Sequence, residues 1–121
     1  MLRQELVENV VEVERFCDRM MRVKMVLGKT VYHVLSVYAP QVGRPIAEKE
    51  DFRNKLEDII TSIDENDGII VAGDLNCHIG SNNAGYENIM GRYGFGDRND
   101  DGLALLDMFN NHGLKIANTY F

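Results

Sequence analysis

Hydrophobic and polar residues alternate in neighbouring segments near the start of the chain, and this pattern predicts a β-hairpin. In residues 21–27, apolar side chains alternate with arginine and lysine, the period of a strand with one wet face. Gly28-Lys29 offers a tight turn, since glycine tolerates the positive φ that short hairpin loops require. Residues 31–38 (V-Y-H-V-L-S-V-Y) are apolar on both faces, which predicts an inner strand. A weaker alternation in residues 10–14 predicts an added edge strand.

A helical period replaces the strand period in residues 47–66. Apolar side chains recur there at i, i+4, i+7, i+8 and i+11, which places them on one stripe of a helix. The residues of this stripe are Phe52, Leu56, Ile59, Ile60 and Ile63. Gly68 is a stop signal for the helix. The short apolar run at 69–72 then predicts a strand that is covered on both faces.

The second half of the chain begins with an irregular, glycine- and asparagine-rich stretch at 81–101. A loop of this length inside a compact domain is usually functional or disordered. A second helix is expected after Asn99-Asp100-Asp101, good capping residues, with Gly113 ending it. Its apolar arc is formed by Leu105, Leu106, Met108 and Phe109. Residues 115–119 predict one last strand, and the order β-β-α-β-loop-α-β predicts a layered α/β fold.

Length and composition indicate the class of protein. With 121 residues, 45% of them hydrophobic and 26% charged, residues 1–121 are expected to form a single globular domain. The two cysteines, Cys17 and Cys77, have no Cys-x-x-Cys spacing and predict reduced thiols in an intracellular protein, nuclear or cytoplasmic. No apolar segment approaches the ~18–20 residues that cross a bilayer, so no membrane partner is expected.

The net charge limits the partners. At −6, with a pI near 5.0, the chain should not attract a phosphate backbone by bulk charge. Phosphate chemistry would therefore need a local site, with a metal cation to offset the carboxylates.

The stretch Gly73-Asp74-Leu75-Asn76 is the first candidate for chemistry, because it directly follows a predicted buried strand. Sites in α/β sheets gather at the carboxyl ends of strands. On an extended backbone, Asp74 and Asn76 would point the same way. A carboxylate that accepts a proton from water, beside an amide that donates to an oxyanion, suits hydrolysis. The alternative is a turn in which both side chains bond their own backbone.

Tyr38 is the second candidate, at the end of the inner strand and two residues before Pro40. Its hydroxyl could contact a phosphate. The alternative is a core tyrosine with only its hydroxyl at the surface.

Two further patterns favour structural roles. Residues 97–102 (D-R-N-D-D-G) match the first half of a calcium loop, but the twelfth place is Met108 instead of glutamate, so helix capping is expected instead. The histidines, His33, His78 and His112, stand in no metal-binding pattern and are expected to be structural.

Y-A-P at 38–40 and G-D-L-N at 73–76, separated by a helix, resemble the endonuclease/exonuclease/phosphatase superfamily of metal-dependent phosphoesterases. The chain is most similar to the endonuclease segment of RTE-type (Bov-B-like) LINE retrotransposons. The resemblance implies a two-sheet α/β sandwich that cleaves DNA with Mg²⁺ or Mn²⁺. It implies that Asp74 orients or deprotonates the attacking water, that Asn76 stabilises the transition state, and that Tyr38 contacts the scissile phosphate.

The resemblance also implies nucleic-acid contacts in the glycine-rich stretch, where Arg92, Tyr93 and Arg98 are weak candidates. In the superfamily, a metal-binding glutamate and an asparagine lie upstream of the matched region, and an aspartate–histidine pair lies downstream. None of these appears in the present sequence. We therefore expect the middle portion of a sandwich truncated at both ends, inactive alone and marginally stable or self-associating. The alternative is a non-catalytic, retroelement-derived remnant that binds a protein partner through an uncovered face.

Overall fold

The computed structural model describes residues 9–41, 43–94 and 96–120 and divides the chain into two compact units. The first contains the segments up to Pro40 and 46–75, and the second contains 41–45 and the segment from Asn76 onward. The mixed α/β class expected from the sequence is confirmed, in agreement with part of a two-sheet sandwich. The elements are β1 (Val10–Cys17), β2 (Met20–Leu27), β3 (Thr30–Tyr38), α2 (Ile46–Ser62), β4 (Gly68–Asp74), α3 (Asp100–Asn111) and a 3₁₀ turn, η1 (Ala117–Thr119).

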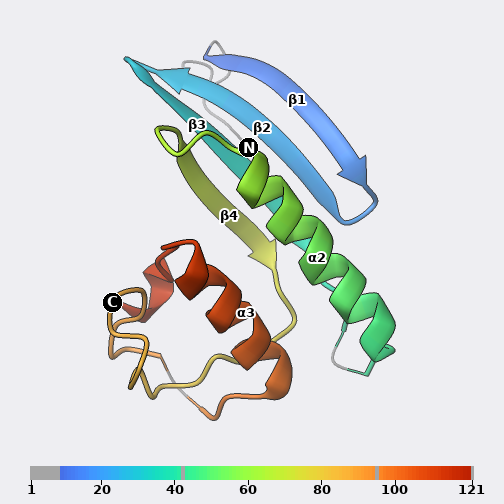
Figure 1. Cartoon of the computed structure of the whole chain (residues 1–121), viewed down its shortest axis with the longest axis vertical. Helices are drawn as coiled ribbons and strands as arrows, with labels where there is room; N and C mark the ends of the chain where they lie inside the picture. Colours follow the sequence, from blue (N-terminus) through green and yellow to red (C-terminus); the bar gives the residue numbers. More distant parts are fainter. Residues whose placement is uncertain (1–8, 42, 95, 121) are drawn as a thin grey trace. The chain divides into compact units, whose positions relative to one another are not determined.

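The first unit is built on a four-stranded sheet in the order β1-β2-β3-β4 (Figure 1). β1, β2 and β3 pair antiparallel, and β4 joins β3 in parallel after the chain has passed through α2. The hairpin turns at Gly28, whose φ is +64°. The predicted hairpin, edge strand and inner strand are therefore all confirmed.

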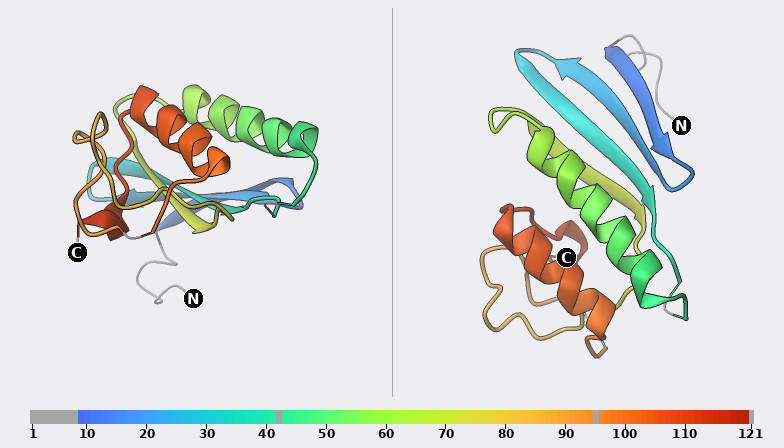
Figure 2. Two further views of the ribbon diagram at one scale, coloured as in Figure 1. Left: turned by 90° about the horizontal axis from the view of Figure 1, so that it is seen from below. Right: turned by 45° about the vertical axis from the view of Figure 1, so that its right-hand side comes forward.

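α2 lies along one face of this sheet (Figure 2). Phe52, Leu56 and Ile60 from its apolar stripe are buried, as the period predicted. On β3, Leu35 and Val37 are buried and share one face by strand alternation. Burial of these side chains removes apolar surface from water, which is the main force that holds the first unit together.

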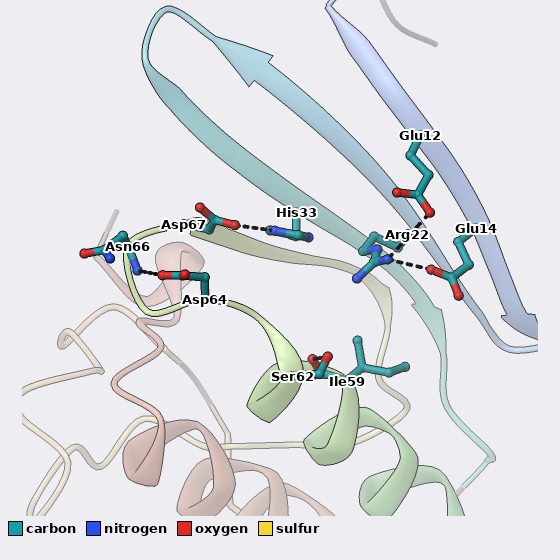
Figure 3. Close-up of polar contacts among 9 residues, drawn as sticks. All are labelled: Glu12, Glu14, Arg22, His33, Ile59, Ser62, Asp64, Asn66 and Asp67. Carbon is teal, nitrogen blue, oxygen red and sulfur yellow. Dashed lines mark hydrogen bonds and ion pairs between the residues drawn. The ribbon is translucent and has the colours of Figure 1, made fainter.

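α2 ends at Ser62, and the predicted extension to residue 66 is wrong. The Ser62 hydroxyl donates to the carbonyl of Ile59 at 2.6 Å, and the backbone N–H of Asn66 donates to Asp64 Oδ1 at 2.8 Å (Figure 3). Short polar side chains that bond nearby backbone groups compete with helical hydrogen bonds. The helix therefore gives way to a turn before Gly68 is reached.

The prediction that residues 69–72 form a strand covered on both faces is wrong in its second part. β4 forms, but Ile70 is 50% exposed and Ala72 is exposed. Because side chains alternate along a strand, Ile69 and Val71 point to one face and Ile70 and Ala72 to the other. β4 is also the end strand of the sheet.

Polar side chains of the sheet are paired with residues from neighbouring strands and loops (Figure 3). His33 is buried, with Nε2 2.8 Å from Asp67 Oδ2, which supports its structural role. Its Nδ1 is also buried and has no hydrogen-bond partner. On β2, Arg22 Nη2 lies 2.5 Å from Glu14 Oε2 and 4.0 Å from Glu12 Oε1. Both glutamates are on β1, so charged side chains of the two neighbouring strands pair with each other.

In the second unit, an irregular chain precedes α3, as predicted. Asn99 caps α3: its side chain accepts hydrogen bonds from the N–H groups of Gly102 at 2.8 Å and His78 at 3.1 Å. The capping role predicted for the calcium-like stretch is thereby confirmed. Gly113 follows the helix with a φ of +69°. The buried side chains of α3 include Leu105, Leu106, Met108 and Phe109.

The predicted strand at 115–119 is wrong. Ile116 makes one isolated parallel bridge with Met90, and η1 follows at once. Thr119 explains the turn, because its hydroxyl donates to the carbonyl of Ile116 at 2.6 Å and accepts from the N–H of Gly91 at 2.9 Å. A side chain that closes the backbone locally replaces the ladder that a strand would need. Among the helices of the described ranges, none has the length and apolar character to cross a membrane.

Candidate functional site

Tyr38 and Asp74 lie together at the carboxyl edge of the sheet. They are the last residues of the parallel strands β3 and β4 and are direct register partners. The next residue, Ala39, donates its N–H to the carbonyl of Asp74 at 2.8 Å, which fastens the two strand ends together. Asp74 is exposed and Tyr38 is 48% exposed. A phenol and a carboxylate are thus presented side by side, at the edge where α/β sheets bind ligands.

Gly73 explains how β4 can end so close to β3. Its φ is +129°, a backbone conformation that residues other than glycine rarely adopt. A Cβ atom at this position would lie 2.0 Å from the carbonyl oxygen of Val37, its register partner. The glycine of the G-D-L-N stretch is therefore needed to place Asp74 opposite Tyr38.

Asn76 differs from the expectation. β4 ends at Asp74, and Asn76 has a φ of +46°, the one positive φ among the non-glycine residues that the structure describes. The prediction that Asp74 and Asn76 share an extended backbone is therefore wrong. Asparagine enters this left-handed region more easily than most residues, and such strained positions cluster at functional sites. Asn76 is also the first residue of this segment of the second unit.

Sequence reasoning missed Arg19, which contacts Tyr38. Its guanidinium carbon lies 5.4 Å from the centre of the Tyr38 ring, and Nη1 donates to the Tyr38 carbonyl at 3.2 Å. Nη2 is 3.1 Å from Glu48 Oε1 on α2. The hairpin register held the signal: Met20 pairs with Val37, which places the preceding residue beside Tyr38.

A hollow of about 230 Å³ opens beside Tyr38. Its polar lining comes from the end of β1, from the turn between β1 and β2, and from β3. These polar residues are Arg15, Asp18, Arg19, Ser36 and Tyr38. The space is therefore bordered by two arginines, one carboxylate and two hydroxyl groups. Arg15 pairs with Asp18 at 3.5 Å and Arg19 pairs with Glu48 at 3.1 Å, so both positive charges are matched.

The predicted nucleic-acid contacts all lie in the second unit. Arg92 is exposed and Tyr93 is 66% exposed. Arg98 is engaged in its own loop, where Nε donates to the carbonyl of Ile79 at 2.7 Å and the guanidinium carbon lies 5.2 Å from the centre of the Tyr86 ring. This arrangement gives Arg98 a structural task, and nucleic-acid contact by the three predicted residues stays a prediction.

Shifted ionisation in the second unit follows from local hydrogen bonds. The Tyr86 hydroxyl donates to Asp107 Oδ1 at 2.5 Å, and this bond raises the pKa of Tyr86 above its ordinary value. The backbone N–H groups of Glu87 and Gly85 stabilise the Glu87 carboxylate and lower its pKa. Hydrogen bonds that favour one protonation state produce such shifts.

The described residues do not form a metal site by themselves. Within ranges 9–41, 43–94 and 96–120, no group of three or more His, Cys, Asp or Glu side chains could hold a metal ion. Asp74 supplies one carboxylate at the carboxyl edge; Mg²⁺ in proteins is usually held by one or two carboxylates and completes its octahedral shell with water and substrate oxygens. Cys17 and Cys77 are not joined in a disulfide.

Comparison with known proteins places this site in a family context. Residues 32–120 match the family described as endonuclease-reverse transcriptase. Craniofacial development protein 2 of Tragulus javanicus is 32% identical over 88 residues, which cover 73% of this chain and 15% of that protein. The protein of the same name from Bos taurus is 30% identical over 104 residues, which cover 86% of this chain and 17% of that protein. The chain thus spans about a sixth of the length of these relatives.

Proposed function

The chain belongs to the endonuclease-reverse transcriptase family, and from this membership and the Tyr38–Asp74 edge we propose that it is part of a nuclease domain that hydrolyses phosphodiester bonds. The observation that carries the proposal is the register pairing of Tyr38 with Asp74, held by the Ala39 N–H bond to Asp74. DNA is the proposed substrate.

Each residue has a role that its chemistry can supply. The Asp74 carboxylate accepts a proton from the attacking water or orients it toward phosphorus. The Tyr38 hydroxyl donates a hydrogen bond to a phosphate oxygen as charge develops there. For Asn76, the resemblance implies stabilisation of the transition state, and its backbone is left-handed two residues after Asp74.

The magnesium or manganese requirement is a proposal that rests on the resemblance to the superfamily. Among the described residues no cluster of three or more His, Cys, Asp or Glu side chains could hold an ion, and no step of the reaction is assigned to one. We propose that these 121 residues alone turn over too slowly for a steady-state assay. The test therefore needs a readout that registers a single cleavage.

One observation favours a second candidate, a non-catalytic interaction module. β4 exposes Ile70 at 50%, and β1 exposes Val13 at 60%. Exposed apolar surface of this kind suits binding to a protein or to a second copy of the chain. In this candidate, the Tyr38–Asp74 pair is inherited without a chemical role.

Nicking of supercoiled plasmid distinguishes the two candidates, since one cleavage converts the whole molecule to the open circle. The folded chain is compared with Asp74→Asn, which keeps the side-chain shape and removes the carboxylate. Asp58→Asn on α2 is the matched control, because it removes the same charge from an exposed site of the same unit. The proposal expects slow nicking in Mg²⁺ buffer that EDTA and Asp74→Asn abolish and Asp58→Asn leaves intact. Equal behaviour of all three proteins would favour the interaction module.

A further inference from the structure

Arg19 joins the end of β3 to α2 through one side chain. It stands in the turn between β1 and β2, and its side chain is 31% exposed. Nη1 donates to the Tyr38 carbonyl at 3.2 Å, while Nη2 reaches Glu48 Oε1 at 3.1 Å. In the opposite direction, the N–H of Tyr38 donates to the carbonyl of Arg19 at 2.9 Å. The two residues are thus bonded through both backbone and side chain.

The same guanidinium lies against the Tyr38 ring, with its central carbon 5.4 Å from the ring centre. This distance is within the range of a favourable cation–π contact. Tyr38 is 48% exposed, so packing by apolar neighbours constrains its ring only in part. The guanidinium therefore limits the directions that the ring can take.

Only arginine suits this arrangement. A planar guanidinium can stack on a ring while its separate N–H groups reach two acceptors. A lysine ammonium keeps the charge but has no plane to stack and no fixed fork. Glu48 neutralises the guanidinium and holds it in place, which leaves Arg19 better suited to orient Tyr38 than to bind an anion directly.

We propose that Arg19 is a positioning residue for Tyr38. By holding the ring at one orientation, it fixes where the phenol hydroxyl lies at the strand end whose register partner is Asp74. The hollow of about 230 Å³ borders Tyr38 and is lined without Asp74. The role in hydrolysis rests on the proposed function, whereas the orientation of the ring can be tested without any activity.

The first arm of the test is the NMR spectrum of the tyrosine rings. The chain has five tyrosines, and Tyr38→Phe identifies the Tyr38 signal by its disappearance. In Arg19→Gln, the Tyr38 ring signals should move toward random-coil positions and gain mobility, while the other four tyrosines keep theirs. Arg19→Lys should show most of the same change. Unchanged Tyr38 signals in a folded Arg19→Gln protein would overturn the proposal.

Arg22 provides a matched control. It also pairs with a glutamate and lies over an aromatic ring, with its guanidinium carbon 5.5 Å from the centre of Phe16. Arg22→Gln should leave the Tyr38 signals in place; if it moved them as Arg19→Gln does, the effect would be general loosening and the proposal would fail. Should Arg19→Gln not fold, Glu48→Gln replaces it, and a smaller shift confined to Tyr38 is expected.

The second arm is plasmid nicking by the same proteins. Misplacement of a reacting group by about 1 Å can cost ~10²-fold in rate, so Arg19→Gln should slow Asp74-dependent nicking by roughly 10- to 100-fold. Arg22→Gln should slow it less than the Arg19 variant does. If wild type shows no Asp74-dependent nicking but the Tyr38 signals still move in Arg19→Gln, the nuclease proposal fails and the positioning of the ring stands. If nicking depends on Asp74 and Arg19→Gln changes neither the rate nor the signals, the positioning proposal alone fails.

Discussion

Replacement of Gly73 with alanine tests whether close approach of β4 to β3 builds the site. The new Cβ would lie 2.0 Å from the carbonyl oxygen of Val37, where ordinary contact begins at 3.4 Å. The backbone also has a φ of +129°, and holding a non-glycine residue in a rarely populated conformation costs on the order of 1–3 kcal/mol. β4 must therefore move away from β3.

The loss of stability is the sum of the backbone strain and the weakening of one hydrogen bond. Movement of β4 weakens the bond from the Ala39 N–H to the Asp74 carbonyl, which contributes about 1 kcal/mol. Together with the backbone strain, Gly73→Ala should lower the free energy of unfolding by roughly 2–4 kcal/mol. This is a large part of the ~5–15 kcal/mol that stabilises a typical domain. Asp74 should also leave its place opposite Tyr38, and nicking should fall.

Gly28→Ala is the matched control, because it lies in the same unit. Its φ is +64°, and nothing lies within 4 Å of its Cβ position, so it adds backbone strain alone. That strain costs about 1–2 kcal/mol. Urea denaturation followed by far-UV circular dichroism measures both variants. If Gly73→Ala loses no more stability than Gly28→Ala, the close approach of the strands has no energetic weight and the reasoning is refuted.

Two further predictions concern paired side chains. Asp67→Ala leaves the buried His33 without its partner and should lower the free energy of unfolding by about 1–3 kcal/mol. Asp64→Ala removes only an exposed hydrogen bond in a turn and should lower it less in the same urea melts. Equal losses in the two variants would contradict this prediction. Asp107→Ala removes the hydrogen bond that raises the pKa of Tyr86, so the ionisation of Tyr86, followed by ultraviolet absorbance, should return toward 10.0; an unchanged titration would count against that cause. Because the folded pKa is raised, this bond stabilises the fold fully below pH 10.0 and loses its effect as the pH rises through the folded value. The stability difference between wild type and Asp107→Ala should therefore shrink there.

The sequence predicted those parts of the fold that depend on local pattern. Period-two alternation found β2 and β3, and the 3.6-residue period found α2 and its buried stripe. The errors arose where single side chains bond the backbone. Ser62 and Asp64 end α2 early, and Thr119 closes η1 within residues 115–119, which were predicted to form a strand. Exposure of Ile70 could not be predicted, because it depends on what lies across the sheet.

The candidate site was predictable only where it depends on local sequence pattern. Strand ends and turn residues pointed to Tyr38 and Asp74, and parallel pairing brings them together. Asn76 departs from an extended backbone because its conformation depends on where β4 ends. Arg19 was missed because its contact with Tyr38 crosses from one hairpin turn to the end of another strand, a relation that appears only once the register is known.

The central claim is that Tyr38 and Asp74 act as one site on a phosphodiester, and a double-mutant cycle in plasmid nicking tests it most directly. Tyr38→Phe, Asp74→Asn and the double variant are compared with wild type, with each protein shown to be folded. Groups that act as a unit have strongly non-additive effects. We predict that Asp74→Asn abolishes most of the nicking and that adding Tyr38→Phe lowers it no further. Single effects that multiply in the double variant, or nicking that neither substitution changes, would contradict a shared site.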